Sequence, residues 1–221
     1  MKEDPQLVFW KGDFGKQYLK RNSLNSEKIN ESEKVFKRIL GGLQLNSILE
    51  VGSNVGINLS GIRRAFGKNI DLYAVEPFEE AYRQLLSNQE INLKEALNCS
   101  AFEIPFEDNS IDYIEAIDLF EHILYPTFPM NECWRVLKDG GTLYIEVPYG
   151  GTEDYYKDPT HVRPFIPKTF KYFAEWNTSP AYELKKWEIL AMKSTLGGEN
   201  QNRIFVSMRP VKDQTLDTDT H

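Results

Sequence analysis

The chain has 221 residues, a formal net charge of -7 and 41% hydrophobic residues. This length fits one domain with its own core, and the glycine and proline content is too low for a collagen-like or low-complexity protein. No apolar run reaches the ~20 residues that cross a bilayer, and the acidic balance disfavours nucleic acid, because phosphate contacts need clustered Lys and Arg.

Cysteine usage and the opening residues narrow the class of protein further. Cys99 and Cys133 are too few for a disulfide framework or a four-cysteine zinc site. The first five residues lack the charged-then-apolar pattern of a secretory signal. We therefore expect a cytoplasmic protein with free thiols, no metal site, and neither a membrane nor a nucleic acid as partner.

The first elements in chain order are an aromatic, basic N-terminal stretch and a long helix. Gly12 and Gly15 should interrupt any long helix within that stretch. Apolar residues then recur at helical spacing over 26–40, with Ser26 as a candidate N-cap. The sequence therefore predicts a helix at 26–40 that is preceded by a separate N-terminal segment.

Short apolar runs alternate with amphipathic helical patterns through the middle of the chain, which predicts a parallel sheet with helices on both faces. After residue 148 a stretch rich in Pro, Tyr, Phe and Gly predicts a long ordered excursion to about residue 180. Two last apolar runs predict a closing hairpin. The predicted strands are 47–51, 71–75, 93–98, 112–117, 142–147, 183–192 and 203–208, and the predicted helices between them end near residue 66, span 78–89 and end near residue 137.

A glycine-rich loop, EVGSNVGIN at residues 50–58, follows the first predicted strand. Such a turn lets a ligand approach the backbone, and the amides of the next helix suit polar or anionic groups. The dinucleotide pattern G-x-G-x-x-G fails, because Asn54 and Ile57 occupy two of its glycine positions. Asn tolerates a positive φ, so the turn is retained. A tight turn without any ligand is the alternative interpretation.

The same loop resembles motif I of the class I S-adenosylmethionine-dependent methyltransferases, E/D-x-G-x-G-x-G, with Asn54 in place of the middle glycine. Three later segments are similar to the type 11 branch of that family. They are CSAFEIPFEDNSID at 99–112, AIDLFEHI at 116–123 and RVLKDGGTL at 135–143. The resemblance implies an α/β fold with a Rossmann-like, seven-stranded, mostly parallel sheet, helices on both faces and an antiparallel last strand.

The resemblance also implies S-adenosylmethionine as the cofactor and assigns residues to it. A carboxylate in the position of Glu76 accepts hydrogen bonds from the ribose hydroxyls, and a charged acceptor makes them strong. Ser100 replaces the acid that contacts the adenine in the family. The implied cofactor-binding residues of the central segments are Glu50, Gly52, Ser53, Asn54, Gly56, Asn58, Glu76, Pro77, Ser100, Ala101, Phe102, Ile117 and Asp118.

The N-terminal stretch FWKGDFGKQYLKRN, at 9–22, resembles the opening of methylases associated with pseudaminic acid biosynthesis. Tyr18 and Arg21 lie one helical turn apart, a spacing at which both side chains can close over the carboxylate of the cofactor. We therefore include them among the cofactor-binding candidates. The alternative is that the aromatic residues of this stretch only fill an exposed groove.

Candidate catalytic residues follow from the chemistry that the resemblance implies. Methyl transfer is an in-line displacement, and a hydroxyl acceptor also has to lose its proton. His161, with Asp158 nearby in DPTHVRPF, lies in the excursion and is the first candidate for a base. His122, after the fourth predicted strand, is the second. Hydrogen bonding to the backbone, in a purely structural role, is the alternative for each histidine.

These observations lead to the hypothesis of a methyltransferase that acts on a small molecule, with O-methylation favoured and a sugar or nucleotide sugar of surface polysaccharide biosynthesis as acceptor. An N/D-P-P-Y/F loop, typical of amino-methylating nucleic-acid enzymes, is replaced by IDLF. The alternatives are a small-molecule N- or carboxyl-methyltransferase, or a catalytically inactive methyltransferase-like binding or scaffold protein. We expect a monomer or homodimer with an N-terminal flap at 1–25, one domain at 26–210, an acceptor-side insertion at 148–180 and a disordered tail at 211–221.

Overall fold

A computed structural model describes residues 5–175, 184–197 and 201–212. Its strands form one sheet in the order β3-β2-β1-β4-β5-β7-β6. β7 runs antiparallel to β5 and β6, while the pairs among β1 to β5 are parallel, so the predicted fold class is confirmed. The strands are β1 (Ser47–Val51), β2 (Asp71–Val75), β3 (Glu95–Leu97), β4 (Ile111–Ile117), β5 (Leu137–Pro148), β6 (Trp187–Thr195) and β7 (Arg203–Pro210).

The helices follow the predicted alternation with the strands. The long predicted helix before β1 is present with the expected bounds, and short helices occupy the excursion after β5. Among the described residues the α-helices are α1 (Pro5–Trp10), α2 (Asp13–Arg21), α3 (Ser26–Leu40), α4 (Ile57–Phe66), α5 (Glu79–Ser87), α6 (Thr127–Val136), α7 (Glu153–Tyr156) and α8 (Pro167–Ala174), and the 3-10 helices are η1 (Gly67–Asn69) and η2 (Phe120–His122).

Two local predictions in the N-terminal region need correction. Asn25, not Ser26, is the N-cap of α3, because its extended backbone lets the side-chain oxygen accept from the amides of the next turn. The chain breaks near Gly12 as predicted, but Gly15 lies inside α2. A Cβ on Gly15 would lie 1.9 Å from the carbonyl oxygen of Trp10, so this glycine permits close packing of α1 and α2.

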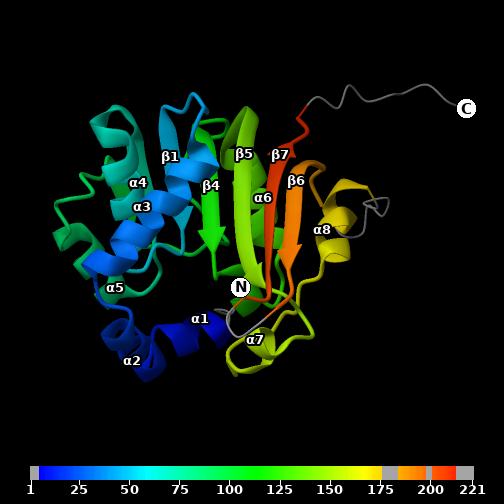
Figure 1. The fold of residues 1–221 in the computed structure, drawn as a ribbon, viewed down its shortest axis with the longest axis horizontal. Helices are drawn as coiled ribbons and strands as arrows, with labels where there is room; N and C mark the ends of the chain where they lie inside the picture. The colour runs from blue at the N-terminus through cyan, green and yellow to red at the C-terminus, as the bar shows by residue number, and fades with distance from the viewer. Residues whose placement is uncertain (1–4, 176–183, 198–200, 213–221) are drawn as a thin grey trace, which may run out of the picture.

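The core occupies both faces of the sheet because side chains alternate along each strand. On one face, Phe36 and Leu59 of the front helices belong to a buried cluster with Ile48. On the other face, Leu49 is buried in a cluster with Met130 of α6. Figure 1 shows α3 and α4 in front of the sheet and α6 behind it. Each fully buried apolar side chain of this size contributes roughly 1.5–3 kcal/mol.

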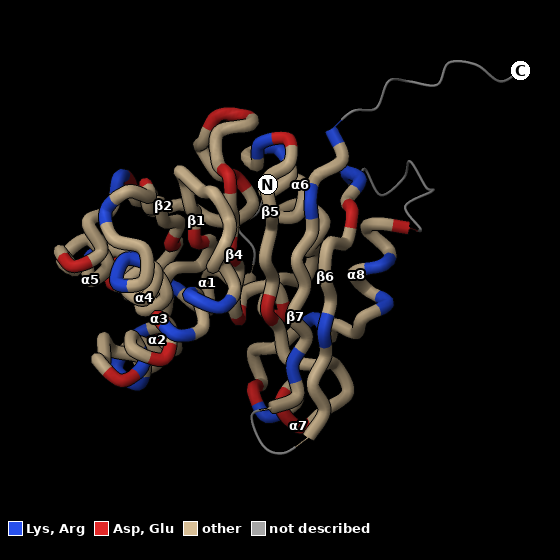
Figure 2. The backbone as a smooth tube through the Cα atoms, turned by 45° about the horizontal axis from the view of Figure 1, so that its top comes forward, with Lys and Arg blue, Asp and Glu red and all other residues tan. Residues whose placement is uncertain are grey.

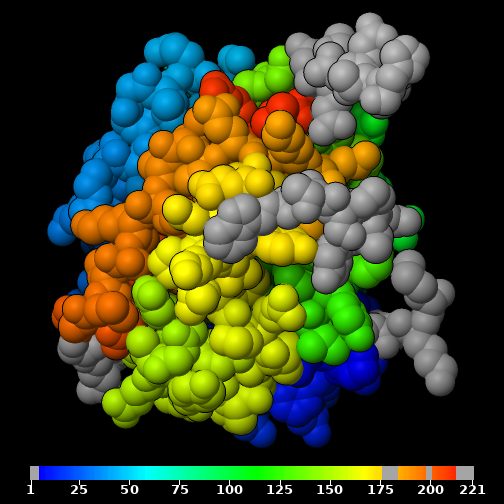
Figure 3. Space-filling view, turned by 90° about the vertical axis from the view of Figure 1, so that its right-hand side faces the viewer, coloured from blue at the N-terminus to red at the C-terminus, as the bar shows by residue number. Residues whose placement is uncertain are grey.

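The N-terminal helices and the first part of the excursion after β5 are found at one edge of the sheet. α1, α2 and α7 lie at the lower edge in Figure 1, where the parallel strands end. Figure 3 shows the described part of the excursion beside the N-terminal helices at that edge. Segments at 176–183 and 213–221, which include parts of the predicted insertion, sixth strand and tail, lie outside the described residues.

The distribution of charged residues and the length of the helices indicate which partners the surface can contact. Basic and acidic positions are interspersed over α5, α8 and the connecting loops in Figure 2. Within the described residues, no helix has the length and apolar character needed to cross a bilayer.

Candidate functional site

The loop after β1 has the backbone geometry that its glycines and asparagine predict. Gly52, Asn54 and Gly56 have φ values of 83°, 47° and 78°, so the expected tolerance of Asn54 for a positive φ is confirmed. The Gly52 amide donates to the carbonyl oxygen of Val75 at 2.8 Å. A Cβ on Gly56 would lie 2.5 Å from Ile91. The loop is therefore fixed against β2 in a conformation that suits few other residues.

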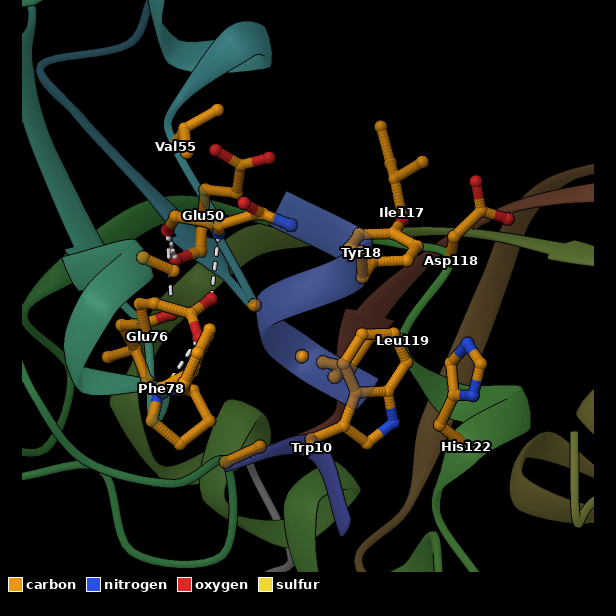
Figure 4. A pocket seen from close by; sticks show the side chains of 18 of the residues that line it. Trp10, Tyr18, Glu50, Val55, Glu76, Phe78, Ile117, Asp118, Leu119 and His122 are labelled. Atoms are coloured by element: carbon orange, nitrogen blue, oxygen red, sulfur yellow. Dashed lines mark hydrogen bonds between the residues drawn. The ribbon is translucent and has the colours of Figure 1, made fainter. Parts of the chain in front are cut away.

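Two buried carboxyl groups lie at this edge, Glu50 at the end of β1 and Glu76 directly after β2 (Figure 4). Glu76 accepts hydrogen bonds from the amides of Asn54 at 2.7 Å and Phe78 at 2.8 Å. One oxygen of Glu50 accepts from Asn58 at 2.8 Å, whereas Oε2 has no partner among the described residues. A buried oxygen without a donor costs free energy, so this end of the site favours a ligand that supplies one.

Burial sets the protonation of both groups. Desolvation raises the pKa of Glu50 to about 8, a shift that the neighbouring Glu76 increases and the hydrogen bond from Asn58 opposes. Desolvation likewise raises the pKa of Glu76 to about 7, against its two backbone hydrogen bonds. A cationic or hydrogen-bond-donating ligand would favour the ionised form of both carboxyl groups.

A cavity of about 320 Å³ extends from these carboxyl groups towards β4 and the N-terminal helices. Among the predicted residues, His122 lines it from η2, which begins three residues after β4. Arg21, Gly56, Asp158 and His161 do not line the cavity as described. The other predicted residues that line it are Tyr18, Glu50, Gly52, Ser53, Asn54, Asn58, Glu76, Pro77, Ser100, Ala101, Phe102, Ile117 and Asp118.

Several lining residues come from the N-terminal segment, where only Tyr18 and Arg21 are predicted to bind the cofactor. The Trp10 ring meets the rings of Tyr18 and His122 edge-on, with centroids 4.9 Å apart in each case. Arg21 is exposed, with its guanidinium 5.9 Å from the centre of the Tyr18 ring. The high aromatic content of this stretch was the available signal. The lining residues missed there are Gln6, Leu7, Trp10, Gly15, Leu19 and Asn22, and Lys28 of α3 was missed as well.

The predicted histidines lie next to each other, their ring centroids 4.8 Å apart. Nδ1 of His122 lies 3.2 Å from the carbonyl oxygen and 3.0 Å from the hydroxyl oxygen of Thr160. That hydroxyl donates to Asp158 at 2.7 Å. Nδ1 of His161 donates to the carbonyl oxygen of Tyr155 at 2.7 Å. Asp158 therefore orients His122 through Thr160, and His161 lies behind His122, away from the cavity.

A third group, Glu121, completes this histidine cluster. Its carboxylate is buried, and Oε1 lies 3.9 Å from Nε2 of His161. Desolvation, and next the carboxylate of Asp118, hold the pKa of Glu121 well above its usual range. Desolvation, together with His161, lowers the pKa of His122 to about 4. Without a ligand, the Glu121 carboxyl group and the His122 ring are thus both uncharged at neutral pH.

Comparison with known proteins places these features in context. Residues 49–145 match the family model described as "Methyltransferase domain". A curated relative, phosphoethanolamine N-methyltransferase 2 of Caenorhabditis elegans, is 26% identical over 152 residues, which are 66% of this chain. The match spans about a third, 34%, of that relative's length.

Solved structures share the fold over most of the chain. A methyltransferase from Aquifex aeolicus, described as dependent on S-adenosylmethionine, has a TM-score of 0.65 at 22% identity, covering 88% of this chain and 98% of its own. A structure from Thermotoga maritima, described as a possible histamine N-methyltransferase, has a TM-score of 0.63 at 16% identity, covering 92% and 99%. At these identities the likeness establishes the fold.

Proposed function

We propose that this chain is a class I S-adenosylmethionine-dependent methyltransferase that transfers the cofactor's methyl group to a hydroxyl of a small molecule. The observation that carries the proposal is the pair of buried carboxyl groups, Glu50 and Glu76, at the glycine-rich end of the cavity. When bound, the cofactor supplies a methyl group on a sulfonium that is already activated for in-line displacement.

The residues at this end fit that cofactor. Glu76 is fixed by two amides and retains acceptor capacity for ribose hydroxyls. Glu50 Oε2 lacks a donor among the described residues, which suits the ammonium group of the cofactor. Ser100 to Phe102 line the same cavity, and the amide of Phe102 already bonds to the Ser100 hydroxyl at 3.3 Å. This segment is our candidate for the adenine contact.

The acceptor belongs at the other end of the cavity. Trp10, Tyr18 and His122 line that end, and flat aromatic faces with a few polar groups suit a small polar molecule such as a sugar. The hydroxyl would be placed beside His122, and the histidine cluster would promote the loss of its proton. We propose that α1 and α2 act as the flap over this site and that the 148–180 insertion shapes it.

The aromatic N-terminus, similar to that of methylases linked to pseudaminic acid, supports a sugar or nucleotide sugar as acceptor. The relative named as an N-methyltransferase supports an amine acceptor instead. In that alternative the enzyme only positions the acceptor and uses no catalytic base. The histidine cluster favours a hydroxyl, because a hydroxyl is a poor nucleophile until its proton is removed. The remaining alternative, a binding or scaffold protein without catalysis, predicts cofactor binding without turnover, or no binding at all.

Calorimetric titration of S-adenosylmethionine into the wild-type chain and Glu76→Gln tests the cofactor site. We expect the variant to bind about 10- to 100-fold more weakly, since hydrogen bonds to a charged acceptor contribute roughly 1.5–3 kcal/mol. Glu80→Gln, on the exposed side of α5, is the matched control and should bind like the wild type. Unchanged affinity in Glu76→Gln would refute the assigned site.

Labelled cofactor then identifies the acceptor class. Panels of nucleotide sugars, amino alcohols and their phosphates, and small carboxylic acids are incubated with the protein, and the methylated products are identified by mass spectrometry. Label on a hydroxyl oxygen supports the proposal. Label confined to amines or carboxylates, or tight cofactor binding without any transfer, would contradict it.

A further inference from the structure

The histidine cluster has a geometry that hydrogen bonding alone does not explain. One ring nitrogen each of His122 and His161 and one carboxylate oxygen of Glu121 lie within 4.8 Å of one another. The three side chains come from two distant segments, η2 and the insertion. Backbone bonds hold these segments together, because Val162 and Arg163 both donate their amides to the carbonyl oxygen of Glu121, at 2.9 and 3.0 Å.

The tautomer of His122 follows from its neighbours. Thr160 has one hydroxyl proton, which it donates to Asp158, so its oxygen can only accept from His122. The Thr160 carbonyl oxygen accepts at the same ring nitrogen. Nδ1 of His122 therefore carries the proton, and Nε2 of the neutral ring has a free lone pair.

The same argument applies to His161. Its Nδ1 lies 2.7 Å from the carbonyl oxygen of Tyr155, which accepts only, so this nitrogen also carries the proton. Nε2 of His161 is then an unprotonated nitrogen that faces the carboxylate of Glu121 at 3.9 Å. Histidines that bind metals show this arrangement, with one nitrogen fixed by a backbone carbonyl or a carboxylate-linked group and the other directed at the ion.

Glu121 supplies the independent observation. Its side chain is 1% exposed, and neither carboxylate oxygen has a hydrogen-bond partner among the described residues. A second carboxylate, Asp118, lies near enough to raise its pKa, and Arg203 is already paired with Asp118 and Glu146. The buried Glu121 carboxyl group, with Nε2 of His161 facing it, thus has no donor of its own, and a bound cation would supply the missing partner.

We propose that Glu121, His122 and His161 bind one divalent first-row transition metal ion, such as Zn²⁺ or Mn²⁺. Bonds of about 2.0–2.2 Å to nitrogen and oxygen require ligand atoms within roughly 4.2 Å of each other. The observed separations approach this limit, so side-chain shifts of less than about 1 Å would complete the site. Two histidines and one carboxylate leave coordination positions open for another ligand.

The role of the ion rests on the proposed function. Of the three proposed ligands only His122 lines the cavity as described, so the open coordination position would have to face that side for an acceptor hydroxyl to reach it. A bound divalent ion lowers the pKa of such a hydroxyl, which releases its proton to solvent. The hydroxyl oxygen then forms the bond to the methyl carbon, the carbon–sulfur bond breaks, and its electron pair stays on sulfur. Asp158 acts as a positioning residue through Thr160 and His122.

Metal binding is measured first without the cofactor, on the untagged chain, because a histidine tag binds the same ions. Co²⁺ is titrated while its visible absorption is followed, and Zn²⁺, Mn²⁺ and Mg²⁺ are compared by calorimetry. We expect one ion per chain, with Mg²⁺ the weakest because it prefers oxygen ligands. Absence of binding by Co²⁺, Zn²⁺ and Mn²⁺ in a protein that binds S-adenosylmethionine would overturn the inference and leave the proposed function intact.

Matched variants locate the site. Glu121→Gln and His161→Gln should each lower the Co²⁺ affinity at least about 100-fold, while Thr160→Val should lower it roughly 10-fold, because the hydroxyl that accepts from Nδ1 of His122 is lost. Glu121→Gln replaces a buried carboxyl group by an amide of nearly the same shape, so it should fold even if His161→Gln does not. His221→Gln, outside the described residues, controls for histidine content and should bind normally. Binding that survives both Glu121→Gln and His161→Gln would refute the assigned ligands.

Discussion

The two ends of the cavity are built in different ways. The glycine-rich end comes from residues close in sequence, since Glu50, Asn54 and Asn58 lie within nine positions and Glu76 follows the adjacent strand. Backbone amides fix the Glu76 carboxylate, and the Asn58 side chain donates to Glu50. The histidine end is lined by residues of α1, α2 and η2, and side-chain contacts among them and with the insertion help to fix it.

If the proposed function holds, this difference would separate recognition of the cofactor from choice of the acceptor. A loop that depends on backbone conformation tolerates few substitutions, so it can hold one invariant ligand. Side chains contributed by three separate segments can change independently, and they can adapt one fold to many acceptors. Substitutions at the glycine-rich end should therefore affect folding and cofactor affinity, and those at the histidine end should affect turnover of the acceptor.

The largest expected effect is on stability, from Gly56→Ala. The added Cβ would lie 2.5 Å from Ile91 and 2.6 Å from Leu85, at a φ of 78° that disfavours any side chain. We expect a loss of about 2–4 kcal/mol in the free energy of unfolding, measured by urea denaturation.

Gly42→Ala is the control for Gly56→Ala. Gly42 also has a positive φ, of 94°, but a Cβ there would meet no atom of the described residues within 4 Å. Only the backbone cost of about 1 kcal/mol remains. Equal losses in the two variants would show that crowding beneath the loop is unimportant.

The sequence predicted the fold and the glycine-rich end well for the same physical reason. Strand alternation and the loop at residues 50–58 are local patterns, and the parallel order brings Glu76 beside the loop. The role of Trp10, the burial of Glu121 and the position of His161 behind His122 depend on contacts between distant segments. Periodicity and motif spacing carry no information about such contacts.

The second prediction concerns the pH dependence of cofactor affinity. Burial raises the pKa of Glu76 to about 7, and a protonated carboxyl group cannot use both oxygens as strong acceptors. Binding to the ionised form must displace the proton below that pH, so affinity should fall by up to about tenfold per pH unit from pH 7 downwards. Calorimetric titrations between about pH 5.5 and 8.5 measure this slope.

Stability without cofactor should show the opposite sign. The raised pKa means that folded Glu76 holds its proton more tightly than the unfolded chain, so this stabilisation is present at low pH and is lost as the pH rises from about 4.5 to about 7. Glu76→Gln removes this contribution from both profiles. An affinity profile that is flat in the wild type would contradict ionised Glu76 as the ribose acceptor.

The third prediction tests the histidine end through Trp10→Ala. The ring contacts Tyr18 and His122, and such edge-on contacts contribute about 0.5–1.5 kcal/mol each. We expect the KM for the acceptor to rise about tenfold, with a smaller change in cofactor affinity. Phe9→Ala, in the same helix but half exposed, is the control. A larger loss in cofactor affinity than in acceptor KM would contradict the separation of the two ends.

The smallest effect is expected from Ser100→Asp, which supplies the acid that the family resemblance places against adenine. The Ser100 hydroxyl accepts from the amide of Phe102, and an aspartate can make the same local bond, so the turn should persist. One added hydrogen bond of about 0.5–1.5 kcal/mol predicts about two- to tenfold tighter cofactor binding by calorimetry. Asn109→Asp adds the same charge on an exposed turn and should leave the affinity unchanged. If Ser100→Asp instead weakens binding, the adenine does not lie against this segment, and the cofactor end of the cavity is defined by Glu50 and Glu76 alone.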